Sequence, residues 1–82
     1  MSTIVLRNKS SEYTLECKCT IEEIENLSNS LLPSVETQLN TSIDMIIQNN
    51  TATFLCDGVS PMLFEFICLI FKREMTKNNI LA

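Results

Sequence analysis

Every second side chain is apolar along residues 13–19, and the side chains between them are polar. A period of two is typical of a strand with one buried face and one wet face. A similar alternation returns in residues 43–47 and 51–56, on either side of Gln48-Asn49-Asn50. Asparagine tolerates the left-handed backbone of a tight turn, so these two segments are predicted to form an antiparallel hairpin.

A helix is predicted to begin after Thr20, because Thr20-Ile21-Glu22-Glu23 has the form of a capping box. The acidic residues of its first turn also complement the positive end of the helix dipole. Pro33 is expected to end this helix near Leu32. Its apolar positions make one narrow stripe, formed by Ile21, Ile24, Leu27, Ser28 and Leu31.

A second helix is predicted over residues 61–75, with Ser60 as its N-cap and Pro61 as its first residue. Its apolar side chains cover about twice the ~100° arc that a helix lying on a sheet needs. Packing of the first helix against part of this surface is one interpretation. That helix offers few apolar side chains, however, so we expect the remaining surface to bind a partner.

The predicted order is strand, helix, strand, strand, helix, which indicates an α+β fold with a three-stranded antiparallel sheet and two helices on one face. A right-handed crossover would place residues 51–56 in the centre of the sheet. Residues 1–82 are long enough for one domain. Residues 1–12 and 76–82 are expected to be loosely ordered ends, although a short leading strand over residues 3–6 is an alternative.

Composition narrows the functional classes. The formal charge is −4, which argues against a stand-alone nucleic-acid binder. Histidine is absent, which removes the commonest general base and metal ligand. No segment reaches the ~18 apolar residues of a membrane span and no secretory signal is recognisable, so a cytoplasmic or nuclear location is expected.

Catalytic and metal chemistry are not expected. The four cysteines occupy core-type positions without zinc-knuckle spacing, and they are predicted to be reduced and buried. A cysteine nucleophile would have no histidine base, and a single glycine cannot form a phosphate-binding loop. We therefore predict no enzymatic activity, no cofactor and no metal for this chain; the cysteines are Cys17, Cys19, Cys56 and Cys68.

The layout of residues 13–75 resembles the Pcc/CTAG family, the small subunit of the KEOPS (EKC) tRNA-modification complex. The matching features are Tyr13-Thr14-Leu15-Glu16, Leu31-Leu32-Pro33, the hairpin over residues 43–56, and Asp57 before the apolar last helix. Family members often carry arginine near the start of that helix, where this chain has Pro61-Met62-Leu63-Phe64. This departure argues against RNA contact there and leaves a partner-binding role.

The resemblance implies a non-catalytic scaffold that supports threonylcarbamoylation of adenosine beside the tRNA anticodon. Such subunits pair with themselves or with a small partner through sheet edges, and their helices dock on the Kae-type catalytic subunit. By position on the helix, Leu63, Phe66, Ile67 and Ile70 are expected to face the sheet. The expected partner interface is Leu27, Leu31, Phe64, Cys68, Phe71 and Met75.

Lys72, Arg73 and Lys77 cluster at the end of the last helix. Cations are favourable there because they complement the negative end of the helix dipole, and a supporting contact to RNA is the alternative.

Two other functions stay open. A stand-alone RNA- or ribonucleoprotein-binding module would need a basic sheet face, and the predicted strands do not supply one. A homodimeric adaptor unrelated to tRNA is the third interpretation.

Overall fold

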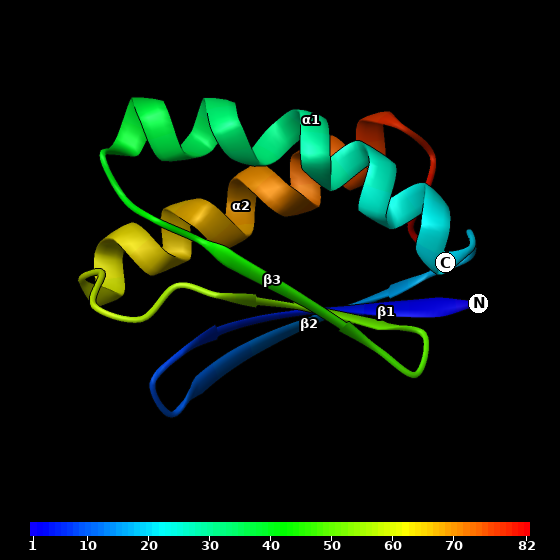
Figure 1. The fold of residues 1–82 in the computed structure, drawn as a ribbon, viewed down its shortest axis with the longest axis horizontal. Coiled ribbons are helices and arrows are strands. Elements are labelled where there is room, and N and C mark those ends of the chain that lie inside the picture. The colour runs from blue at the N-terminus through cyan, green and yellow to red at the C-terminus, as the bar shows by residue number, and fades with distance from the viewer.

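The computed structural model describes all 82 residues as a two-layer α+β fold, with both helices on one face of a single sheet (Figure 1). This confirms the predicted fold class. The elements in chain order are β1 (Ser2–Asn8), β2 (Ser11–Cys17), α1 (Ile21–Leu39), β3 (Asp44–Gln48), β4 (Thr51–Leu55) and α2 (Pro61–Lys77).

The sheet has four strands in the order β2-β1-β4-β3. β1 pairs antiparallel with β2 and parallel with β4, and β3 and β4 form the predicted antiparallel hairpin. The expectation of a three-stranded antiparallel sheet is therefore wrong in strand number and in direction. Residues 51–56 were expected at the centre of the sheet. β4 is an inner strand, but it is one of two, because β1 lies between β4 and β2.

β1 also corrects the expectation that residues 1–12 form a loose end. Its side chains alternate between buried and half-buried along the whole strand, and Ile4 and Leu6 are fully buried. The buried residues at the two ends of β1, Ser2 and Asn8, are polar, so the alternation does not appear as an apolar pattern in the sequence. Both polar side chains find partners, because Ser2 Oγ donates to the Cys19 carbonyl at 2.9 Å and Asn8 Nδ2 donates to the Val59 carbonyl at 3.1 Å.

α1 begins with the predicted capping box: the Glu23 amide donates to Thr20 Oγ1, and the Thr20 amide donates to a Glu23 carboxylate oxygen. The helix does not end near Leu32 but continues through Pro33 to Leu39. Proline removes a single backbone donor, while Leu32 and Val35 on either side of it are buried in the core. Their burial carries the helix past the break.

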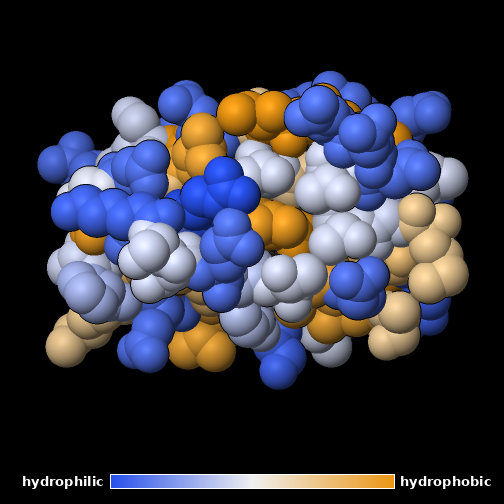
Figure 2. Space-filling view, turned by 90° about the horizontal axis from the view of Figure 1, so that it is seen from below, coloured by the Kyte–Doolittle hydropathy of each residue, from blue (hydrophilic) through white to orange (hydrophobic).

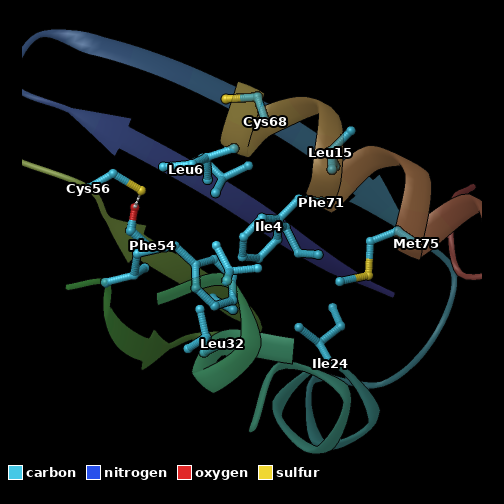
Figure 3. Close-up of a cluster of buried hydrophobic side chains, with 14 of the residues drawn as sticks. Ile4, Leu6, Leu15, Ile24, Leu32, Phe54, Cys56, Cys68, Phe71 and Met75 are labelled. Atoms are coloured by element: carbon cyan, nitrogen blue, oxygen red, sulfur yellow. Dashed lines mark hydrogen bonds between the residues drawn. The ribbon is translucent and has the colours of Figure 1, made fainter. Parts of the chain in front are cut away.

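The core lies between the helices and the sheet (Figure 3). Ile24 and Leu32 of α1 point toward the same cluster as Phe71 and Met75 of α2, above the central strand residue Ile4. The rings of Phe54 and Phe71 pack at 4.8 Å between centroids with an interplanar angle of 54°. Tilted aromatic packing of this kind is favourable beyond the area that it buries.

The C-terminal residues also differ from the expected loose end. α2 extends to Lys77, Ile80 is buried, and Leu81 forms a bridge with Cys17 on the outer edge of β2. The Lys18 amide donates to the Ile80 carbonyl at 2.8 Å, and the Ala82 amide donates to the Glu16 carbonyl at 3.0 Å. Both chain termini therefore lie at the same end of the molecule (Figure 1).

The second face of the sheet carries no helix. Figure 2 shows it as a mixture of hydrophilic and intermediate residues with separate hydrophobic spots. Register places Thr14, Val5, Thr53 and Ile46 in one row across the four strands. Neither helix is both long and apolar enough to cross a membrane.

Candidate interaction surfaces

The inner side of α2 holds the residues that were expected to meet a partner. Phe71 and Met75 are fully buried, and Phe64 and Cys68 are less than a tenth exposed. The predicted interface at these four positions is therefore wrong, because they form the core between α2 and the sheet. Of the residues expected to face the sheet, Ile67 does so, whereas Phe66 is exposed and Leu63 and Ile70 are half-buried.

The outer side of α2 is apolar in its first half. Met62 is 80%, Phe66 50% and Leu69 63% exposed. Ordinary apolar residues on a helix in a monomer point toward the core, so three large exposed side chains on consecutive turns are unusual. The surplus of apolar surface predicted from the sequence is real, but it lies on the arc opposite to the expected one.

Phe66 has apolar neighbours on its own helix. Leu63 and Ile70 lie one turn before and one turn after it on α2, and both are half-buried. Leu27 and Leu31 lie one turn apart on α1 and are half-buried as well. We call Leu27, Leu31, Leu63, Phe66 and Ile70 the helix-face patch. The placement of Leu27 and Leu31 beside a partner stays a prediction.

The basic residues of α2 follow this apolar surface. Lys72, Arg73 and Lys77 are all exposed, and none takes part in an ion pair. The one ion pair of the molecule joins Arg7 and Glu12 across β1 and β2 at 2.8 Å. The outer side of α2 therefore changes from apolar to cationic along its length.

The two edges of the sheet differ. β3 is an outer strand whose free edge no other segment covers, and Ile46 and Ile47 are 49% and 37% exposed. The outer edge of β2 is partly covered by the bridge to Leu81. An exposed apolar edge strand is a ready template for pairing with another strand. β3 is thus the better candidate for pairing through a sheet edge.

The cysteines are structural. All four are free thiols, and Cys17, Cys56 and Cys68 are buried. Burial raises the pKa of each of these three thiols to about 11, so they stay protonated near neutral pH and are weak nucleophiles. Cys56 Sγ donates to the Phe54 carbonyl at 3.8 Å (Figure 3). No three histidine, cysteine or acidic side chains lie close enough together to hold a metal ion.

Comparisons of the chain with protein-family models, with curated proteins and with solved structures give no match.

The sequence carries a signal for the exposed side of α2. Glu65, Arg73 and Lys77 all project from the same side of the helix as Met62 and Phe66. Charged residues interspersed on an arc indicate that the arc faces solvent. The number of apolar side chains predicts the surplus, whereas the position of the charged residues indicates which side of α2 the sheet leaves uncovered.

Proposed function

We propose that this chain is a non-catalytic scaffold subunit that docks on a larger partner through the helix-face patch. The exposure of Phe66 on α2, between the half-buried Leu63 and Ile70, carries this proposal. The partner that we propose is the Kae-type catalytic subunit of a KEOPS complex, which is the assembly that the resemblance implies. The chain would then support synthesis of N6-threonylcarbamoyladenosine in tRNA without supplying a catalytic group.

The layout of the elements supports this assignment. The strand, helix, hairpin and helix on which the resemblance rests correspond to β2, α1, β3–β4 and α2. The chemistry of the surface is also consistent with docking and not with catalysis. Docking would bury the part of these side chains that is still exposed, and Phe66, which is 50% exposed, would contribute most to the apolar area removed from water.

Pairing through a sheet edge is the second part of the proposal. We assign it to β3, whose apolar residues Ile46 and Ile47 lie beside an uncovered row of backbone donors and acceptors. The occupant would be a second copy of this chain or a small partner subunit. Two copies joined at β3 would form one continuous sheet and leave both helix layers free to bind the catalytic subunit.

Co-expression with a Kae-type subunit tests the docking surface. Phe66→Asp should abolish co-purification, because it places a charge in the centre of an interface that must be dry. It should leave the circular dichroism spectrum and the unfolding midpoint nearly unchanged, since Phe66 is half exposed in the free chain. Thr37→Asp adds the same charge on an exposed position of α1 outside the patch and should bind normally.

Phe71→Asp provides the opposite control. Phe71 is fully buried, so this change should lower the free energy of unfolding of the isolated chain by several kcal/mol. Failure of the unmodified chain to co-purify would contradict the assignment to a KEOPS complex. Normal co-purification of Phe66→Asp would contradict the docking surface while leaving the partner in place.

A further inference from the structure

Five exposed residues of α2 lie on one line along its outer side, which we call the outer seam. They are spaced alternately four and three residues apart, and they are Met62, Phe66, Leu69, Arg73 and Thr76. This alternation keeps one side of a helix toward a neighbour that packs along its length, as in coiled coils. The outer seam therefore has the spacing of a surface that binds another helix.

A shallow depression in the second half of the outer seam has the shape that such packing uses. It is lined by Leu69, Lys72, Arg73, Thr76 and Lys77. The first four of these residues are i, i+3, i+4 and i+7, which surround one point on a helix surface and form a hole for a side chain of a facing helix. The depression is open to solvent, so a side chain of a partner can enter it.

The charges beside the outer seam are divided along its length. Its second half has three exposed cations, none of which takes part in an ion pair: Lys72, Arg73 and Lys77. Glu65 is the one exposed carboxylate of α2 and lies in the first half, while Glu74 is half-buried. A complementary partner therefore has apolar side chains opposite the first half and carboxylates opposite the second.

Neither a second copy of α2 nor a nucleic acid complements both halves. In an antiparallel two-fold pair the apolar half of one copy would meet the cationic half of the other, and in a parallel pair the cations would meet each other. A nucleic acid would leave Met62 and Leu69, 80% and 63% exposed, without apolar contacts. The net charge of −4 also opposes binding of a polyanion.

We propose that the outer seam binds one amphipathic helix of a partner protein. The apolar side chains of that helix pack on Met62, Phe66 and Leu69, and its carboxylates, one or two turns farther along, meet the cations of residues 72–77. The inference rests on the proposed docking function and specifies the partner segment that the exposed side of α2 takes. Apolar contact supplies the affinity, and the charges select the partner and fix its direction.

Two fluorescein-labelled helical peptides of about 18 residues test this occupant by fluorescence anisotropy. Both have leucine at seam spacing in one half, and the charged residues of the other half are all glutamate in one peptide and all lysine in the other. The glutamate peptide should bind at least about tenfold more tightly, because only its charges complement those of the outer seam. In a ¹H–¹⁵N spectrum the amides of Leu69 and Arg73 should shift on binding.

Variants of the chain locate the binding surface. Arg73→Glu should weaken binding of the glutamate peptide roughly three- to tenfold. Lys9→Glu, at an exposed position in the turn between β1 and β2, makes the same change in net charge and should alter binding less than about twofold. Leu69→Ser should also weaken binding at least about threefold, because it removes an apolar contact at the centre of the seam.

Four results would overturn the proposal: equal binding of the two peptides, equal loss in Arg73→Glu and Lys9→Glu, no binding at about 1 mM, or occupation of the seam by something else. A uridine oligonucleotide that binds more tightly, and loses binding in Arg73→Glu but not in Leu69→Ser, would assign the surface to RNA. A dimer that Leu69→Ser dissociates, measured by light scattering, would assign it to a second copy.

Co-purification with a Kae-type subunit separates this inference from the proposed function. Selective binding of the glutamate peptide without co-purification would contradict the proposed function and leave the helix-binding seam in place. Co-purification without selectivity between the peptides would contradict this inference alone.

Discussion

At the scale of single residues, two phenylalanines on α2 show how position decides the role of a side chain. Phe71 is fully buried against Phe54, while Phe66, on the opposite side of the same helix, is half exposed. Both are large and apolar, so composition does not distinguish them. Phe71 contributes to stability by filling the core, and Phe66 is available to contribute to binding.

The buried thiols give a prediction about pH. Between pH 9 and 11 the unfolded chain releases thiol protons that the folded chain keeps, because the pKa values of Cys17, Cys56 and Cys68 are raised from 9.0 to about 11. The stabilisation is complete below pH 9 and is lost as the pH rises through 11. Each thiol should lower the free energy of unfolding by up to about 1.4 kcal/mol per pH unit in this window.

Urea unfolding followed by circular dichroism from pH 8 to 11 measures this fall. The Cys56→Ala variant should show a shallower slope than the parent chain, since one of the three thiols is missing. Comparing the two chains removes the contribution of the other groups that titrate in this range. An unchanged slope would show that Cys56 does not couple ionisation to folding.

At the scale of elements, α1 contains a local conflict that packing overrides. Pro33 cannot donate to the carbonyl of Asn29, and its ring crowds the preceding turn. Both Pro33 and Asn29 face solvent, so water can satisfy the free carbonyl. The helix continues because Leu32 and Val35 are buried, and Asn40 ends it in the left-handed conformation at φ 51°.

Replacement of this proline should therefore stabilise the protein. Pro33→Ala is expected to raise the free energy of unfolding by about 1–3 kcal/mol, because it restores the missing hydrogen bond and relieves the crowding. Ser34→Ala, at the next exposed position, should change it by no more than about 0.5 kcal/mol. Urea unfolding of the three chains gives the comparison. A loss of stability in Pro33→Ala would mean that stiffening of the unfolded chain by proline dominates.

At the scale of the whole molecule, β1 holds the sheet together. It is paired on both sides, with β2 along one edge and with β4 along the other. Its inward side chains Ile4 and Leu6 are fully buried beneath both helices. β2 and the β3–β4 hairpin are therefore joined into one sheet only through β1.

A charged residue inside β1 should unfold the protein. Leu6→Asp buries a carboxylate without a partner and is expected to cost more than about 3 kcal/mol. Thr3→Asp places the same charge on the open face of the same strand and should cost about 1 kcal/mol. Thermal unfolding distinguishes the two variants. If both were tolerated equally, β1 would not occupy the centre of the sheet in solution.

The sequence alone determined the local features of this protein. The two-residue period of β2, the Asn49-Asn50 turn between β3 and β4, and the caps at Thr20 and Ser60 were all predictable. Each depends on interactions between residues close in the chain. The surplus of apolar surface on α2 was predictable for the same reason, since it follows from helical geometry.

Only the tertiary structure decided the remaining features. Insertion of β1 beside β4 joins residues almost fifty positions apart, and no local pattern encodes such a pairing. The buried side of α2 was likewise undetermined, because Phe64 and Phe66 are equally apolar and the neighbouring sheet decides which one is covered. The passage of α1 through Pro33 required the same information. Burial against distant segments outweighs local preference wherever the two disagree.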